Sequence, residues 1–150
     1  MKKSALILTI SILMTACLST LAFGEELKVQ NSLFVDVAII DFNGKIYDAN
    51  RWTLGTYNLK GIVYNQSFEH IGFVEQSDGV SEVKDIHYKV MAKVAEDGEI
   101  TDADGNLMGK ITETKITDKD GRLLFRLSGS MVQKGLLVYL FFFNDTFRSK

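Results

Sequence analysis

Residues 100–109, with the sequence ITDADGNLMG, carry the acidic side chains whose spacing most resembles a metal site. Asp102, Asp104 and Gly105 follow the order of carboxylates and glycine found in EF-type calcium loops. If Gly105 takes the sixth place of such a loop, Ile100 takes the first and Ile111 the twelfth, where an oxygen ligand and a bidentate glutamate are required. Both ends are apolar, so we predict a structural turn here, with no metal ion and no other cofactor.

Acidic residues from different turns offer a second chemistry, that of a small envelope hydrolase. Asp48, Asp85 and Asp102 would have to converge as general acid and base. This is the least favoured interpretation, because the same aspartate recurs wherever a turn needs it. His70 and His87 have no serine or cysteine partner at a recognised motif spacing, and we expect them to be solvent-facing or packed. No catalytic residue is predicted, and we do not expect an enzyme.

Aromatic side chains suggest a third chemistry, the stacking of a ring against a sugar. Tyr47, Trp52 and Tyr64 fall at positions that are otherwise polar, so they are expected to be at least partly exposed. They are the candidate ligand-binding residues of a carbohydrate-binding module. In the alternative interpretation, Trp52 folds over its own hairpin tip and the tyrosines pack across neighbouring strands.

The elements that position these residues become visible when the chain is aligned with itself. Similar segments recur with spacings of 16 to 20 residues. Counted from the start of each segment, they share an apolar first, ninth and twelfth position, an Asp or Asn at the third, and mostly Gly at the tenth. The five copies start near Ile46, Val63, Val83, Ile100 and Ile116. Each copy is predicted to be a β-hairpin with a type I turn followed by a left-handed residue.

Two sets of residues in the repeat have predicted structural roles. The third-position side chain can accept a hydrogen bond from the backbone two residues on, and a glycine at the sixth position suits the left-handed conformation. The turn residues are Asp48, Asp85, Asp102, Gly105, Asp118 and Gly121. The tenth-position glycines Gly55, Gly72 and Gly109 are expected either at a β-bulge or where copies approach a crowded axis, and we favour a mixture of both.

The segments outside the repeats are predicted to close an all-β body. Leu33 to Phe42 is strand-like, and the apolar run Leu136–Phe143 has the length of a strand buried on both faces. If one face of that run stayed uncovered, it would instead be a surface for homo-oligomer formation.

The stretches IYDANRWTLG, ITDADGNLMG and ITDKDGRLLF resemble the motif of the five-fold β-flower family of small exported bacterial proteins. The resemblance covers about residues 43–129 and implies five hairpin-like repeats around a pseudo-five-fold axis, closed by terminal strands. It implies no activity. Arg51, Phe68 and Tyr88 replace the turn glycine of the motif, which therefore does not by itself predict the turn at those three tips.

The N-terminus predicts export. Residues 1–24 have the basic start, apolar stretch and small-residue exit of a cleaved signal peptide, which leaves residues 25–150 as a single all-β repeat domain. The alternative is a lipoprotein anchored at Cys17, the only cysteine. Cleavage before Glu25 removes two lysines and no acids, so the formal net charge goes from −2 to −4, which argues against nucleic-acid binding. No later stretch is long enough for a transmembrane helix.

Together these patterns predict an exported, non-enzymatic structural or binding module of the bacterial envelope, either periplasmic or secreted. Its expected partner is an unidentified protein or glycan of the cell envelope.

Overall fold

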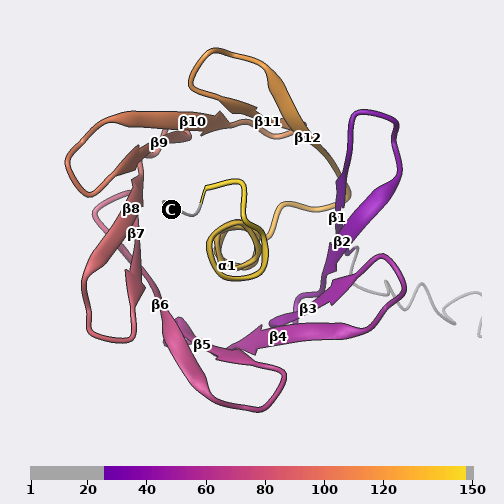
Figure 1. The fold of residues 1–150 in the computed structure, drawn as a ribbon, viewed down its shortest axis with the longest axis horizontal. Coiled ribbons are helices and arrows are strands. Elements are labelled where there is room, and N and C mark those ends of the chain that lie inside the picture. Colours follow the sequence, from indigo (N-terminus) through magenta and orange to yellow (C-terminus); the bar gives the residue numbers. More distant parts are fainter. Residues whose placement is uncertain (1–25, 148–150) are drawn as a thin grey trace, which may run out of the picture.

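The chain forms a closed antiparallel β-barrel of twelve strands in a computed structural model that describes residues 26–147 (Figure 1). The strands are β1 (Leu27–Gln30), β2 (Asp36–Ile40), β3 (Lys45–Asp48), β4 (Thr53–Tyr57), β5 (Ile62–Asn65), β6 (His70–Ser77), β7 (Val80–Asp85), β8 (Val90–Val94), β9 (Glu99–Asp102), β10 (Leu107–Ile111), β11 (Lys115–Asp118) and β12 (Leu123–Ser128). The all-β class is confirmed. The predicted signal peptide, its cleavage before Glu25 and the lipid site at Cys17 lie outside the described residues.

The strands form six hairpins rather than the five that the sequence predicts. We number them 1 (β1–β2), 2 (β3–β4), 3 (β5–β6), 4 (β7–β8), 5 (β9–β10) and 6 (β11–β12). Hairpin 1 was missed because its tip, from Asn31 to Val35, contains no glycine and no acidic residue. The barrel is closed by pairing of β1 with β12, where Val29 lies opposite Leu127.

All six hairpin tips share one hydrogen-bonding pattern. At the tip of hairpin 2, the Asp48 N–H donates to the carbonyl of Trp52 (2.9 Å) and the Arg51 N–H donates to the carbonyl of Asp48 (3.1 Å). Asp48 Oδ1 accepts the backbone N–H groups of Asn50 and Trp52, both at 2.9 Å. The sixth-position residue has a positive φ in every copy: Phe34, Arg51, Phe68, Tyr88, Gly105 and Gly121. The turn therefore forms even where the motif glycine is absent.

The inner face of the barrel is built from two repeat positions. The first-position side chains are fully buried and lie opposite the tenth-position residues, as with Ile46 and Gly55. Beside this pair the register shifts by one residue, so that Leu54 is the extra residue of a β-bulge. Five other hairpins have the same shift. The bulge brings the ninth and tenth positions to the interior.

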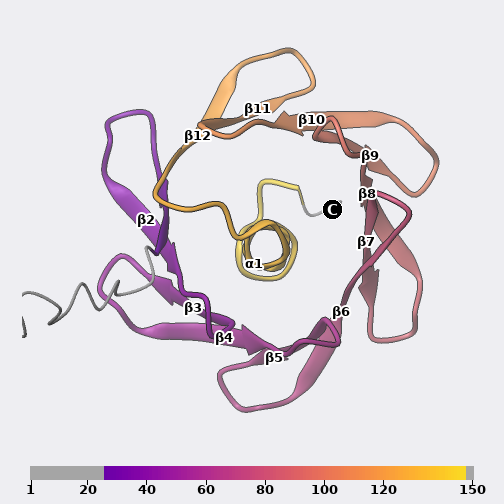
Figure 2. The ribbon, with the colours of Figure 1, turned by 180° about the vertical axis from the view of Figure 1, so that it is seen from behind.

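A helical segment fills the barrel, where the sequence predicts a strand. Helix α1 (Gln133–Val138) continues into a π-helical turn, η1 (Tyr139–Phe143), and both lie at the centre of the ring (Figure 1). The chain reaches this position directly from the end of β12 (Figure 2). Every residue from Leu136 to Phe142 is at most 6% exposed, so this stretch belongs to the core and presents no exposed apolar face.

Closure of the sheet explains why this apolar run is helical. A strand inside a closed barrel would find no free sheet edge, and its backbone N–H and C=O groups would remain unpaired. A helix satisfies those groups within the segment itself. Among the described residues, no helix combines the length and the apolar composition needed to cross a membrane.

Candidate functional site

The three aromatic residues expected to bind ligand do not form one site. Tyr47 lies on β3, and its hydroxyl donates to Asp41 Oδ2 (3.2 Å). Desolvation and the Asp41 carboxylate raise the pKa of Tyr47, so it remains a neutral donor. Tyr64 lies on β5, with its ring 6.2 Å from that of His70. Both tyrosines are half-buried, and only Trp52 projects into solvent, with 73% of its surface exposed.

Trp52 instead lines a hollow with Phe68, a residue that the sequence interpretation did not select. This outer hollow has a volume of about 340 Å³ and lies between the tips of hairpins 2 and 3. Trp52 and Phe68 are its aromatic residues, and its polar residues are Lys45, Thr53, Thr56, Asn65 and Gln66. Gln66 fixes the geometry, because its Nε2 donates across the hairpin boundary to the carbonyl of Thr53 (2.6 Å).

Phe68 has an unfavourable backbone conformation and a solvent-exposed ring. Its φ is 60°, in the left-handed region that bulky residues rarely adopt, and its side chain is 80% exposed. The feature of the sequence that could have identified Phe68 is the absence of the motif glycine at its position. Residues with a strained backbone concentrate at functional sites, where contacts with the surrounding structure hold the unfavourable conformation in place.

The equivalent side chains of three other tips cover the neighbouring hairpin. Phe34 lies over the guanidinium of Arg126 on β12, with 4.3 Å between the ring centroid and Cζ. Arg51 forms a bidentate ion pair with Glu26 (3.0 and 2.8 Å). Tyr88 stacks on Phe73 of β6 with 4.2 Å between ring centroids.

The predicted hydrolase carboxylates are separated by the fold. Asp48, Asp85 and Asp102 lie at the tips of hairpins 2, 4 and 5, and each accepts two backbone N–H groups of its own turn. The Asn106 side chain and backbone hold the pKa of Asp102 below its usual value. The part of the chain that the structure describes contains no group of three or more His, Cys, Asp or Glu side chains placed to hold a metal ion.

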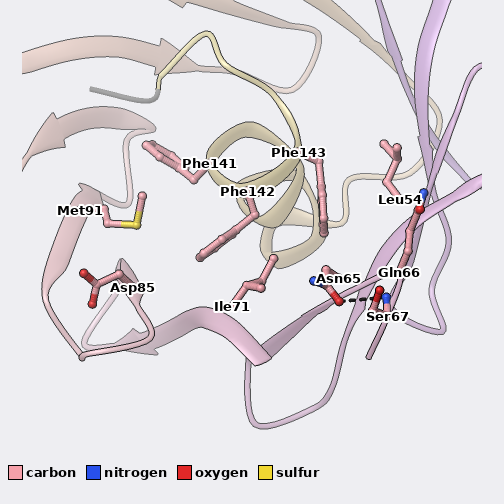
Figure 3. A pocket seen from close by; sticks show the side chains of 10 residues that line it. All are labelled: Leu54, Asn65, Gln66, Ser67, Ile71, Asp85, Met91, Phe141, Phe142 and Phe143. Atoms are coloured by element: carbon pink, nitrogen blue, oxygen red, sulfur yellow. Dashed lines mark hydrogen bonds between the residues drawn. The ribbon is translucent and has the colours of Figure 1, made fainter. Parts of the chain in front are cut away.

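A second hollow lies at the end of the barrel where η1 ends, and we call it the mouth cavity (Figure 3). Its volume is about 600 Å³. Apolar residues of the central segment, which consists of α1 and η1, and of the ninth repeat position line it, with polar residues from two tips: Leu54, Ile71, Met91, Phe141, Phe142, Phe143, Asn65, Gln66, Ser67 and Asp85. Asn65 and Gln66 also line the outer hollow, so the tip of hairpin 3 separates the two.

Comparison with family models, with curated proteins and with solved structures finds no match to this chain.

Proposed function

We propose that this protein is an exported, non-enzymatic binding module of the bacterial envelope, and that the outer hollow binds a sugar ring of an envelope glycan. One observation carries the proposal: Trp52 and Phe68, from successive hairpin tips, line a single hollow whose other walls are polar side chains. Export, the envelope location and the kinship with β-flower proteins are part of the proposal and rest on the sequence.

The chemistry of the outer hollow suits a carbohydrate. The apolar C–H face of a pyranose packs against aromatic rings, and its hydroxyl groups need donors and acceptors around the rim. Lys45 supplies donors, the hydroxyls of Thr53 and Thr56 supply both, and Gln66 Oε1 supplies an acceptor. The Gln66 bond to Thr53 holds the tip of hairpin 3 in place before a ligand arrives, which reduces the ordering cost of binding.

Trp52 is the only tryptophan of the chain, so tryptophan fluorescence, excited selectively over the five tyrosines, reports on the outer hollow alone. We expect a saturable emission change when the protein is titrated with peptidoglycan fragments or with β-linked oligosaccharides. Phe68→Gly should weaken that binding at least about tenfold, equivalent to about 1.4 kcal/mol. Trp52→Ala removes the reporter, so its loss of binding is measured by calorimetry.

Leu59→Ala is the matched control, because Leu59 is 99% exposed and lies outside the outer hollow. It should bind the same glycans as the unmodified protein. If no glycan changes the Trp52 emission and calorimetry detects no saturable binding, the carbohydrate proposal is wrong.

A further inference from the structure

The mouth cavity is a second site, distinct from the outer hollow, with the size and lining of a small-molecule site. Its volume of about 600 Å³ lies within the range of about 300–1,000 Å³ typical of drug-sized ligands. Leu54, Ile71 and Met91 are half-buried around the rim, and Phe141 and Phe142 form its apolar floor. Figure 3 shows the phenylalanine rings reaching from the central segment towards these rim residues.

The backbone around this floor is irregular. Phe141, Phe142 and Phe143 belong to the π-helical turn η1, and such turns occur frequently at functional sites. Two glycines give the rings room, since a Cβ at Gly72 would overlap the ring of Phe142 and a Cβ at Gly55 would overlap the ring of Phe143. The floor is therefore held in a fixed position by the barrel wall.

Asp85 is the one charged residue among those that line the mouth cavity. Asp85 Oδ1 accepts the backbone N–H groups of His87 (2.8 Å) and Lys89 (3.0 Å), which leaves Oδ2 without a donor among the described residues. A carboxylate at the rim of an apolar floor favours a cationic head group and disfavours an anionic one.

We propose that the mouth cavity binds a small amphiphilic amine, with its apolar body against Ile71, Met91 and Phe142 and its protonated nitrogen near Asp85. The charge of Asp85 selects the head group, and the apolar floor selects the body. This site can be tested separately from the glycan proposal, because its ligand contacts neither Trp52 nor Phe68 and the two hollows share only Asn65 and Gln66.

Methionine methyl groups provide a site-specific readout in the wild-type protein. The described residues contain three methionines: Met91 lines the mouth cavity, Met131 lines a separate hollow and Met108 lines neither. With ¹³C-methyl methionine, we expect a saturable shift of the Met91 signal on titration with decylamine, with Met108 and Met131 unchanged. Decanol should bind more weakly, and decanoate should not shift Met91.

Asp85→Asn tests the head-group assignment without removing the turn, because Asn31 and Asn65 occupy the same repeat position. It should weaken decylamine binding at least tenfold and leave decanol binding unchanged. Ile71→Trp should fill the cavity and abolish binding of both. Trp52→Ala should leave the Met91 titration unaltered even where glycan binding is lost.

Three results would overturn the proposal. The first is a Met91 signal that none of the three probes shifts. The second is decanoate binding as tightly as decylamine. The third is an Asp85→Asn protein whose affinity for decylamine is unchanged.

Discussion

Phe68 differs from the other bulky residues that adopt a left-handed conformation at the hairpin tips. A left-handed L-residue costs about 1–2 kcal/mol, and the contacts that Arg51 and Tyr88 make with the neighbouring hairpin offset that cost. The ring of Phe68 remains 80% exposed and so gains little from packing. Stability alone does not explain a phenylalanine at this position, whereas the binding role that we propose would explain it.

Replacing Phe68 with glycine should therefore stabilise the protein. Relief of the left-handed strain outweighs the greater entropy that glycine has in the unfolded chain, and we expect the free energy of unfolding to rise by about 0.5–1 kcal/mol. The matched variant Tyr88→Gly loses the stacking on Phe73 and should be less stable than Phe68→Gly. Urea denaturation of the two variants measures the difference. Equal destabilisation by both would show that the exposed ring of Phe68 contributes to packing.

The sequence specified interactions that span a few residues and missed those between hairpins. The side chain of Asp48 bonds to N–H groups two and four residues away, so its place in the repeat was enough to predict the turn. The meeting of Trp52 with Phe68 depends on how one tip lies beside the next. No local pattern encodes that arrangement, which is why two tyrosines were selected in place of Phe68.

The central segment shows why the hydrophobic periodicity of a sequence can predict the wrong type of element. A helix enclosed on all sides has no polar face, so its sequence shows no repeat of 3.6 residues. Phenylalanine, tyrosine and valine in Leu136–Phe143 also favour strands, and the tertiary environment overrode that preference. Apolar length and burial on both faces were predicted, and only the backbone conformation was wrong.

Truncation of a central side chain should destabilise the whole barrel. Leu140 is fully buried, so Leu140→Ala should lower the free energy of unfolding by about 2–5 kcal/mol through lost burial and the cavity left behind. Leu59→Ala, at a leucine that is 99% exposed, should change it by less than about 0.5 kcal/mol. Chemical denaturation followed by far-ultraviolet circular dichroism compares the two. Similar values would contradict the placement of this segment inside the barrel.

The tenth-position glycines should matter through the aromatic rings and the backbone carbonyls that lie against them. Ala38 and Ala92 occupy the same position in hairpins 1 and 4, whereas a Cβ at Gly72 would overlap the backbone carbonyl of Lys84 as well as the ring of Phe142. Gly72→Ala would press on the ring of Phe142 and on the carbonyl of Lys84, and we expect a loss of about 1–3 kcal/mol from overpacking.

A second substitution tests the cause of that loss. Phe142→Leu in the Gly72→Ala background should recover part of the lost stability, because the smaller side chain makes room for the new methyl group. A double-mutant cycle of unfolding free energies measures the coupling. Strict additivity of the two substitutions would show that the ring is not what the glycine accommodates.

At the scale of the whole molecule, the closed barrel couples each hairpin to the one before it. The Arg51–Glu26 pair joins hairpin 2 to the start of β1, and the pairing of β1 with β12 joins the first hairpin to the last. Because all six hairpins share one central segment, we expect the barrel to unfold in a single transition, unlike an open repeat array.

Acid should weaken this coupled structure. Hydrogen bonds from Arg51 hold the pKa of Glu26 below its usual value, and Lys84 and Lys93 do the same for Glu82. A carboxyl group whose pKa is lower in the folded state stabilises that state fully above the unfolded value, about 4.3 for glutamate. That contribution is lost as the pH falls from this value through the folded pKa. The melting temperature should therefore be nearly constant from about pH 7 to 5 and should fall below about pH 4.

Arg51→Gln tests whether the pair between neighbouring hairpins is responsible for part of that fall. Without the guanidinium, the pKa of Glu26 should rise towards its unfolded value, and the melting temperature should decline less steeply below about pH 4. Lys119→Gln is the control, since it removes one positive charge from the tip of hairpin 6 and leaves Glu26 and Arg51 paired. The difference between the variants should shrink at high salt, because both partners are partly exposed and salt screens them. If the melting temperatures of Arg51→Gln and Lys119→Gln declined equally with falling pH, the contact between hairpin 2 and β1 would not contribute to the stability of the barrel.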